Sequence, residues 1–562
     1  MAGVLNQAQE QLNNLLTCAL NRAMEKGELV KTSIPDFLIE SPDSSIHGDF
    51  ATNIAMVGAR IFRQSPMLLA QKIVDNLSLD GTYFQKCEVA RPGFINFFLG
   101  NAWFKDAIVS VLSEKENYGR SAFGGGEKVL VEFVSANPTG PMHIGNARGG
   151  AVGDCLAELL SWAGYDVTRE FYVNDAGNQI EKFKKSLSIR YMQLYSKDGE
   201  IPLPEDCYQG EDIIQAAQSF AAIHKDKYVG VSEKERAQAL VEYALPLNVK
   251  ALKNDLLKYR IDYDSWFLES KLYKNGKVLK IVDMFKNRGY VYEKDGAVWL
   301  NLTKFKKDKD EVLVRENKIP TYFAADIAYH YDKLVDRKFQ KAINIWGADH
   351  HGHVGRLKAA LEILEVDPKR LNIILMQMVR LVRDGQTVKL SKRSGKSITL
   401  KSLLDEIPID AARFFFNMRE VNSHFDFDLD LAVEQSSKNP VYYVQYAHAR
   451  ICKILKNLEK IGKKPSLDSN YLLLAEREET ELVKAISKFP DEIIASVVSS
   501  NPSRLTKFII DVATLFHKFY GKCKVFGSEE ELLEARLGLC LAVKITLKNA
   551  LSILKISAPE EM

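Results

Sequence analysis

Apolar and polar positions follow patterns that change from one region of this chain to the next. Near the start, apolar side chains recur at helical spacing, at Leu5, Ala8, Leu12, Leu15, Leu16 and Ala19. This spacing predicts an amphipathic helix. Short apolar runs at 129–134, 342–346 and 373–376 predict buried strands, and a helical pattern begins near Ile144.

These patterns divide the chain into three parts. Residues 1–120 combine a helix with strand-like segments, whereas 121–410 alternate strands and helices around a charged, mostly helical insertion at about 177–288. A hairpin is predicted at Asp295-Gly296. Beyond about residue 410 no strand is expected, and helical periodicity continues through 411–562. We therefore expect an α/β protein, with a Rossmann-like parallel-sheet domain carrying a helical insertion, an N-terminal α+β domain and an all-α C-terminal domain.

The composition is that of an ordinary globular protein. The 562 residues are 46% hydrophobic and 27% charged, which excludes collagen-like, low-complexity and wholly disordered classes. The net charge is only +3, so any polyanion must be bound by locally concentrated cations. Seven scattered cysteines without a CxxC pair fit neither a disulfide framework nor a zinc ribbon, and no apolar run is long enough to span a membrane. We expect a cytoplasmic protein.

The first candidate site follows the predicted strand at 129–134. Gly140 and Gly145 have the spacing of a phosphate-binding P-loop, but Asn146 and Ala147 stand where that loop requires Lys and Ser or Thr. What remains is a turn at the carboxyl end of a strand, which opens a helix whose N-terminus favours anions. His143 in this turn could donate a hydrogen bond to a phosphate. The alternative is an ordinary loop histidine that caps a turn.

The second candidate site is a basic loop at 389–395. It follows a hairpin predicted at Asp384-Gly385, and it carries Lys389 and Lys392. Such lysines could neutralise charge that develops on a triphosphate in a transition state. The alternative is a solvated basic loop without a ligand.

A third group of candidates follows the predicted strand at 342–346. Gly347, Asp349 and His353 belong to a segment with three histidines, which is compatible with a zinc site or with a nucleotide site. Tyr322 and Asp326 lie four residues apart, on one face of a predicted helix. They could bind a cation together, or form an ordinary tyrosine–carboxylate contact.

A basic stripe is predicted on a helix of the C-terminal domain. Its cations are spaced by three or four residues, at Arg450, Lys453, Lys456, Lys460, Lys463 and Lys464, opposite apolar residues that include Ile451 and Ile461. The stripe could contact RNA phosphates, or it could be a solvated helix face. Tyr443 and Tyr446, just before it, could stack on unpaired bases.

Several of these segments resemble one enzyme family. Pro141-Met-His-Ile-Gly-Asn146 resembles the HIGH signature of class I aminoacyl-tRNA synthetases, and the segment 132–143 resembles its arginyl version. The loop at 389–395 resembles the KMSKS loop, and 439–450 resembles the start of the arginyl anticodon-binding domain. Asn146 departs from the signature, because it stands where the second histidine is usual.

The resemblance implies an arginyl-tRNA synthetase, which activates L-arginine with ATP to arginyl-adenylate and transfers it to the 3′-terminal adenosine of tRNA(Arg). It implies Mg²⁺ with ATP and an N-terminal domain that contacts tRNA. We separately expect no structural metal, no membrane partner and a monomer. The alternatives are a related nucleotidyltransferase that adenylates a small acid without RNA, and an RNA-binding protein without catalysis.

The resemblance also assigns roles to residues. It implies catalysis by His143, Asn146, Lys389 and Lys392. It implies arginine binding by Glu132, Ser135, Asn137, Tyr322 and Asp326. For ATP it implies Pro138, Gly140, His143, Gly145, Asn146, Gly347, Asp349, His353 and Lys392. RNA binding is expected at Tyr443, Tyr446, Arg450, Lys453, Lys456 and Lys460.

Overall fold

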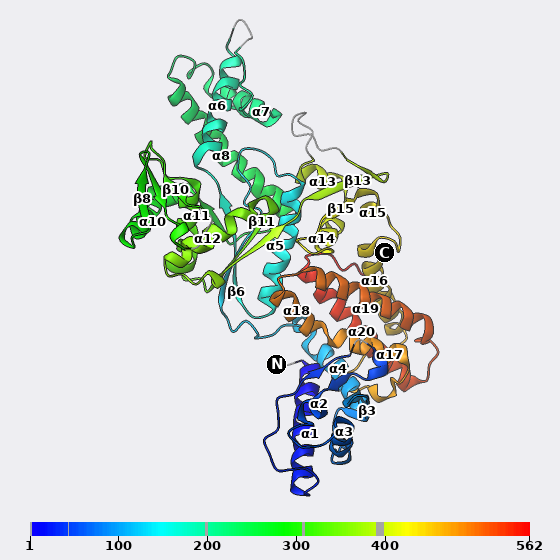
Figure 1. The fold of residues 1–562 in the computed structure, drawn as a ribbon. Coiled ribbons are helices and arrows are strands. Elements are labelled where there is room, and N and C mark those ends of the chain that lie inside the picture. Colours follow the sequence, from blue (N-terminus) through cyan, green and yellow to red (C-terminus); the bar gives the residue numbers. More distant parts are fainter. Residues whose placement is uncertain (1–2, 43, 197–200, 306–308, 389–397) are drawn as a thin grey trace.

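The computed structural model describes residues 3–42, 44–196, 201–305, 309–388 and 398–562. The molecule is elongated (Figure 1). A parallel-sheet domain lies in the middle, a helical insertion projects from one end, and the N-terminal and C-terminal parts pack together at the other end. No helix in the described ranges is both long and apolar enough to cross a bilayer.

The N-terminal domain is a small antiparallel sheet covered by helices. Its strands lie in the order β1-β2-β4-β3 and span Ile39–Glu40 (β1), Phe50–Thr52 (β2), Phe84–Ala90 (β3) and Phe94–Leu99 (β4). Its helices span Val4–Glu25 (α1), Ile54–Gly58 (α2), Pro66–Asp75 (α3) and Asn101–Glu114 (α4). Helix α1 buries Ala8, Leu12, Leu16 and Ala19, which confirms the amphipathic helix predicted at the start of the chain.

The central domain is built on a five-stranded parallel sheet in the order β12-β11-β5-β6-β7. Its strands span Lys128–Glu132 (β5), Asp166–Val173 (β6), Ser265–Leu268 (β7), Lys341–Gly347 (β11) and Leu371–Met376 (β12). The helices beside it span Ile144–Trp162 (α5), Tyr322–Tyr331 (α11) and His351–Ile363 (α12). The strands predicted at 342–346 and 373–376 and the helix predicted near Ile144 are confirmed. The strand predicted at 129–134 is also present, but it ends at Glu132 because Val134 adopts a positive φ.

Two smaller units are attached to the sheet. The projecting insertion contains Gly177–Gln193 (α6), Glu211–His224 (α7) and Glu233–Lys258 (α8), which share a hydrophobic cluster of their own. A separate three-stranded sheet is formed by Val291–Lys294 (β8), Ala297–Leu300 (β9) and Glu311–Val314 (β10), beside Ser270–Lys274 (α9) and Lys277–Asn287 (α10).

The C-terminal half begins with a short sheet and continues as helices. The sheet contains Val379–Arg383 (β13), Gln386–Thr387 (β14) and Phe425–Asp428 (β15). The helices span Leu400–Glu406 (α13), Ile409–Asn417 (α14), Leu429–Val433 (α15), Pro440–Glu459 (α16), Arg477–Ser487 (α17), Phe489–Val498 (α18), Ser503–Lys522 (α19) and Glu530–Ile553 (α20). Both predicted hairpins are confirmed, since Asp295-Gly296 and Asp384-Gly385 adopt positive φ at both positions, as tight primed turns require.

Two strands lie in regions where the sequence predicted no strand. Strand β7 lies inside the region expected to be a mostly helical insertion, and β15 lies beyond residue 410, where no strand was expected. Each has only four residues, too few for periodicity to distinguish strand from helix. Their partners decide the conformation, because β7 completes the edge of the parallel sheet and β15 pairs in parallel with β13.

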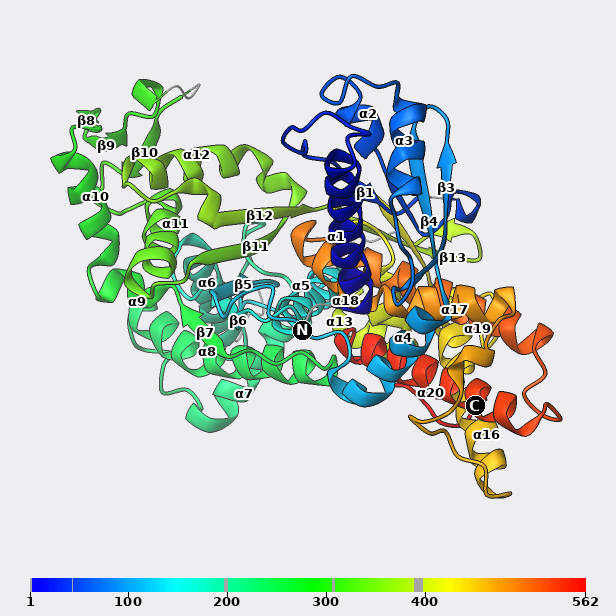
Figure 2. The ribbon, with the colours of Figure 1, turned by 90° about the horizontal axis from the view of Figure 1, so that it is seen from below.

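The N-terminal domain packs against the C-terminal helices, with α4 beside α17 and α20 (Figure 2). The Tyr118 hydroxyl donates to the Ile486 carbonyl at 2.9 Å, and the Asn101 amide donates to the Leu472 carbonyl at 3.1 Å. Lys484 pairs with Asp49 across the same contact. The two terminal parts of the chain therefore form one block.

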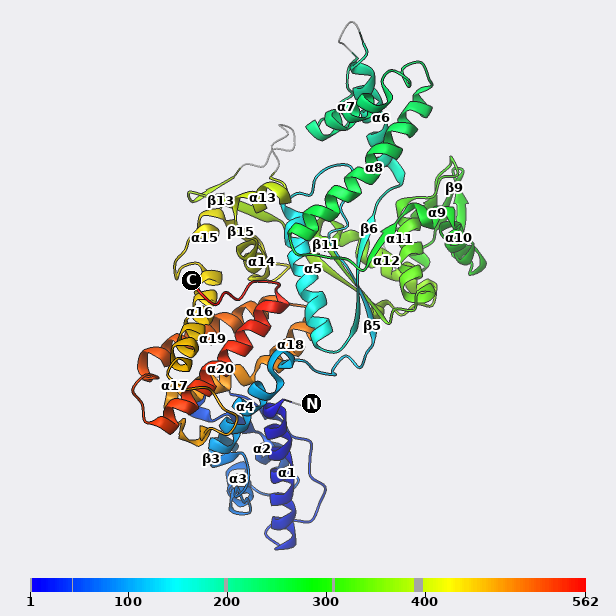
Figure 3. The same ribbon diagram turned by 180° about the vertical axis from the view of Figure 1, so that it is seen from behind.

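A buried charge cluster joins this block to the central sheet. Helix α5 runs from the sheet toward α18 and α20 (Figure 3), and its Asp154 is fully buried. Arg413 of α14 donates to Asp154 Oδ2 at 2.5 Å and also to the carbonyls of Tyr259 and Leu554. Lys555, just after α20, donates to Asp154 Oδ1 at 2.8 Å. One carboxylate thus links the central helix to the end of the helical domain.

Candidate active site

The first candidate site lies where β5 ends and the chain turns toward α5. Glu132 is the last residue of β5, and Val134 and Ser135 follow it with φ of 68° and 42°. Left-handed backbone is strained for a non-glycine residue, above all for β-branched Val134. Helix α5 approaches this turn closely, since a Cβ on Gly153 would lie 2.2 Å from the Phe133 ring. Phe133, at the start of this strained turn, is therefore packed tightly against helix α5.

His143 and Asn146 cap the N-terminus of α5 together. The Gly145 backbone N–H donates to His143 Nδ1 at 3.1 Å, and the His143 N–H donates to Asn146 Oδ1 at 3.0 Å. Because Nδ1 accepts, a neutral ring carries its proton on Nε2. Nε2 of His143 and the amide NH₂ of Asn146 are therefore donors at an N-terminus that favours anions. Gly145 must lack a side chain, because its Cβ would lie 2.9 Å from the imidazole.

The segment after the lysine loop is anchored to this motif. Thr399 forms a β-bridge with His143, and the Leu400 N–H donates to the Met142 carbonyl at 2.8 Å. The residues that follow the lysine loop are therefore in contact with the first motif. Lys389 and Lys392 themselves lie outside the described residues.

Tyr322 and Asp326 begin helix α11, as their spacing predicted. The Tyr322 hydroxyl accepts from the Asn178 N–H at 2.5 Å, and a Cβ on Gly177 would lie 2.6 Å from that oxygen, so the approach requires glycine. Gly177 also has a φ of 77°. Nε2 of His353 donates to Asp326 Oδ2 at 2.8 Å. His353, assigned to ATP by resemblance, thus contacts a carboxylate that was assigned to arginine.

A further carboxylate in this pocket, Glu269, was missed in the sequence. It follows β7 directly and is 1% exposed. Burial, and then repulsion by Asp326, raise the pKa of Glu269 from 4.5 to about 7. Tyr172 and Tyr273 share this environment, and burial together with the neighbouring Glu269 raises the pKa of both hydroxyls above their ordinary value. The signal that could have identified Glu269 is an acidic residue at the carboxyl end of a parallel strand.

Glu132 is buried beneath the pocket, with its carboxylate fully engaged. Oε2 accepts from Lys333 Nζ at 2.5 Å and from the Asn344 amide at 2.7 Å, and Oε1 accepts from the Ser135 hydroxyl at 2.9 Å. Asn137 is exposed in the same turn. Pro138 is buried, and its carbonyl accepts from the Asn248 amide of α8, so the insertion contacts this loop.

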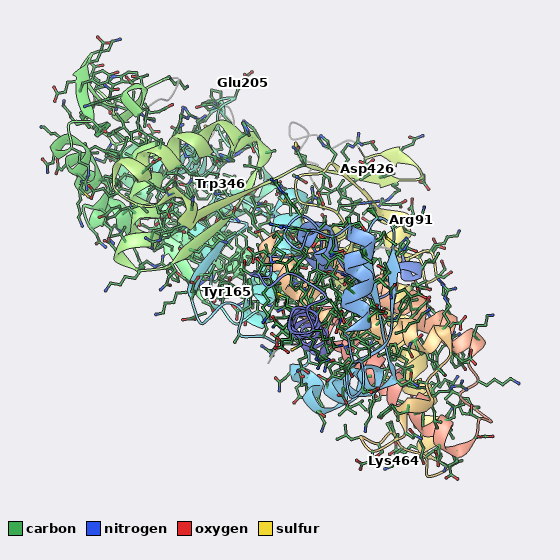
Figure 4. All side chains as sticks on the ribbon, turned by 60° about the horizontal axis from the view of Figure 1, so that its bottom comes forward. Arg91, Tyr165, Glu205, Trp346, Asp426 and Lys464 are labelled. Atoms are coloured by element: carbon green, nitrogen blue, oxygen red, sulfur yellow. The ribbon has the colours of Figure 1, made fainter. Side chains whose placement is uncertain are left out.

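Gly347 ends β11, next to Trp346 at the carboxyl edge of the sheet (Figure 4), and Asp349 follows the strand. The Asp349 carboxylate is 83% exposed and so is accessible to a ligand. It folds back over Gly347, where a Cβ would lie 2.4 Å from Asp349 Oδ1. In the described ranges no group of three or more His, Cys, Asp and Glu side chains is arranged to hold a metal. His353 pairs with Asp326 instead.

The basic stripe is shorter than predicted. Helix α16 ends at Glu459, so Lys460 is its C-cap and the cations after it leave the helix; Ile461, expected on the apolar face, is 69% exposed. Gly462 has a φ of 79°, which suits the end of a helix. The prediction of one helical stripe from 450 to 464 is therefore wrong beyond Glu459. Figure 4 shows Lys464 at the far end of the helical domain, away from Trp346.

The remaining stripe residues differ in their surroundings. The Arg450 guanidinium lies between the Tyr446 and Tyr520 rings, 4.7 and 5.1 Å from their centroids. Tyr443 is half-buried against His517. Lys456 pairs with Glu561 at 2.8 Å, whereas Lys453 is exposed. The aromatic residues and Arg450 therefore form one packed cluster beside a smaller set of exposed lysines.

Three family models together match almost the whole chain. Residues 10–99 match the arginyl tRNA synthetase N-terminal domain, residues 107–451 match the catalytic domain of class I (R) tRNA synthetases, and residues 444–562 match the DALR anticodon-binding domain. The catalytic-domain match alone covers more than half of the chain.

Full-length relatives and solved structures agree with these matches. The chain is 51% identical to the arginine–tRNA ligase of Caldanaerobacter subterraneus subsp. tengcongensis and 50% identical to that of Acetivibrio thermocellus, with 100% of each chain covered. The Thermus thermophilus arginyl-tRNA synthetase structure has a TM-score of 0.71 at 20% identity, covering 97% of this chain and 99% of its own. A Plasmodium falciparum arginyl-tRNA synthetase has a TM-score of 0.71 at 19% identity, covering 98% and 99%. These two structures show the same fold.

Proposed function

The chain belongs to the class I arginyl-tRNA synthetases, and we propose that it activates arginine in the pocket that contains Glu269, Asp326 and Tyr322. The enzyme uses ATP to activate L-arginine and charges tRNA with it. The observation that carries the placement is an excess of negative charge. Glu269 and Asp326 repel each other, and neither has a Lys or Arg partner among the described residues. The arginine guanidinium supplies the missing cation.

The pocket favours arginine over other amino acids for a geometric reason. Two carboxylates and the Tyr322 hydroxyl can accept several N–H groups from a planar guanidinium, whereas an ammonium offers three donors from a single point. Ser135 and Asn137 lie in the turn after β5 and bind the α-amino end of the substrate. Glu132, which is already paired with Lys333, lies beneath this turn.

Activation requires only that the reactants be aligned and the developing charge be stabilised. An oxygen of the arginine carboxylate attacks the α-phosphorus of ATP, and pyrophosphate leaves on the opposite side. His143 Nε2–H and the Asn146 amide donate to phosphate oxygens at the N-terminus of α5, where the helix dipole favours anions. Lys389 and Lys392, predicted from the sequence, add cations from the adjoining loop. Asp349 binds the ribose hydroxyls beside Gly347.

In the second step a hydroxyl of the terminal adenosine of tRNA attacks the carbonyl carbon of arginyl-adenylate and AMP leaves. The cluster of Tyr446 and Arg450 on α16 offers aromatic faces for bases of the anticodon loop, and Lys453 offers a charge for phosphate. Mg²⁺ enters with ATP and is held by phosphate oxygens, which suits an ion that retains most of its own water. We also propose that the enzyme acts as a monomer in the cytoplasm.

The test is ATP–pyrophosphate exchange with arginine, measured with and without tRNA(Arg). We expect arginine-dependent exchange, with lysine as a poor substrate. Exchange in neither condition would refute the proposed site and favour an RNA-binding protein. Exchange driven by another acid, together with no tRNA retention in a filter-binding assay, would favour the nucleotidyltransferase alternative.

A further inference from the structure

A row of polar side chains crosses the central parallel sheet. Asn344 on β11 is in register with Glu132 on β5, Glu132 is in register with Glu170 on β6, and Glu170 is in register with Ser265 on β7. The first three of these residues are at most 5% exposed. Buried carboxylates require cationic or hydrogen-bonding partners, because desolvation penalises their charged form.

Two cations pair with these carboxylates, and both lie close together in the sequence at the end of helix α11. Helix α11 continues as a π-helical turn at Asp332–Asp336, and its Lys333 reaches Glu132 while Arg337, which follows the turn, reaches Glu170 with two hydrogen bonds. The Lys333 side chain is fully buried, and its ammonium also lies 3.9 Å from the centroid of the Tyr329 ring. The same helix begins with Tyr322 and Asp326. A single element therefore carries pocket residues at one end and the partner of Glu132 at the other.

Glu132 also connects Lys333 to the strained turn at Val134 and Ser135 through hydrogen bonds. Its Oε1 accepts from the Ser135 hydroxyl, and the Ser135 hydroxyl in turn accepts from the Tyr172 N–H at 3.2 Å. These two hydrogen bonds hold Ser135 in its left-handed conformation, next to Val134. A strained conformation persists only where its surroundings over-determine it. If the Glu132 carboxylate moved, the hydrogen bond that fixes Ser135 would be lost, and the turn that carries Ser135 and Asn137 could relax to another conformation.

We propose that Lys333 is a positioning residue for arginine, which acts by holding Glu132 so that the turn at 134–137 keeps the geometry that binds the amino acid. This inference rests on the proposed function, because it takes that turn as part of the arginine site. The Lys333 side chain is fully buried against Glu132, so it acts through that carboxylate. The neighbouring His330 supports a fixed arrangement, since burial and the Lys333 charge hold the pKa of its ring well below the ordinary value, and the neutral ring accepts from the Asn344 amide at 3.0 Å.

The test compares Lys333→Met with Lys333→Arg and a matched control. Lys277→Met is the control, because Lys277 pairs with Asp332 and Asp336 of the same π-helical turn but does not contact Glu132. We expect Lys333→Met to raise the KM for arginine by about tenfold or more and to leave the KM for ATP within about twofold, since a small misplacement of a positioning group is costly. Lys333→Arg should recover most of the loss, and Lys277→Met should leave both KM values unchanged.

A double-mutant cycle separates positioning from general stability. If Lys333 acts through Glu132, the variant Glu132→Gln/Lys333→Met should have the same KM for arginine as Glu132→Gln alone. The double variant removes both charges and so leaves no unpaired buried ion, which keeps the comparison valid even if Lys333→Met does not fold. A further rise in the KM for arginine in the double variant would overturn the proposal. An unchanged KM in a folded Lys333→Met would also overturn it, whereas wild-type protein without arginine-dependent exchange would instead refute the proposed function.

Discussion

The raised pKa of Glu269 predicts that arginine binding depends on pH through this residue. Without substrate, burial and the charge of Asp326 hold this pKa at about 7. A guanidinium placed between the two carboxylates favours the ionised form, so binding at pH 6 must release a proton. Glu269→Gln removes the titration but keeps the oxygen that accepts from the Tyr273 hydroxyl at 3.2 Å.

The size of the effect follows from the pKa. With a pKa of about 7, roughly 9% of Glu269 is ionised at pH 6 and roughly 91% at pH 8, so the affinity for arginine should rise about tenfold over this range. Binding at pH 6 should release about 0.9 proton. The same shift has an opposite consequence for the free protein. The native state binds more protons than the unfolded state between pH 4.5 and 7, so the contribution of Glu269 to stability falls as pH rises through that window.

Isothermal titration calorimetry of arginine, in two buffers of different ionisation enthalpy, measures affinity and proton release together. Every other titrating group is common to wild type and Glu269→Gln, so the difference between their pH slopes isolates Glu269. We expect the variant to bind arginine weakly, with little pH dependence, and to unfold at a higher temperature than wild type at pH 8 without substrate. Equal pH slopes in the two proteins would refute the assignment of Glu269 to the arginine site.

Further predictions concern the phosphate site, the pocket and the RNA surface. His143→Ala and Lys392→Ala should each lower the rate of ATP–pyrophosphate exchange by about 10²-fold, the usual cost of losing one transition-state donor; wild-type rates would contradict the mechanism. Asp326→Asn should raise the KM for arginine and weaken discrimination against lysine in the same assay, and unchanged discrimination would remove Asp326 from the pocket. Lys453→Ala should weaken tRNA binding in a filter assay and reduce its salt dependence, because one phosphate contact is lost. Lys456→Ala should have a smaller effect, since Glu561 already neutralises Lys456, and a larger effect than that of Lys453→Ala would contradict this view of the surface.

The parts of the fold that the sequence predicted are those set by local rules. Asp295-Gly296 and Asp384-Gly385 determine their hairpins through backbone conformation alone, and the pairing of Tyr322 and Asp326 on one helix face follows from helical geometry. Helix α16 was predicted too long because basic and apolar residues keep their spacing past Glu459, although the chain turns at Gly462. Periodicity describes a preference and does not mark where a helix stops.

The parts that were missed depend on contacts between distant segments. Glu269 becomes a pocket residue only because β7 joins the edge of the sheet, and four residues carry too little pattern to predict that strand. Lys333 lies in a helix C-terminal turn, where a lysine is ordinarily solvated and favoured by the helix dipole. Its burial against Glu132, 201 residues away in the chain, follows only from how α11 packs on the sheet.

The ion pairs of Asp154 also bear on folding during synthesis, because their partners are added to the chain much later. Its partner Arg413 is synthesised 259 residues later and its partner Lys555 is synthesised 401 residues later. At about 5–20 residues per second, the ribosome needs about 20 to 80 s to make the stretch between Asp154 and Lys555. During that time Arg169, whose Nε lies 3.5 Å from Asp154 Oδ1, is the nearby cation already present on the chain, and Arg413 and Lys555 are added later. Helix α5, which begins at Ile144, lies in the first third of the chain, yet the set of cations around its Asp154 is completed only when Lys555, seven residues before the last residue, has been made.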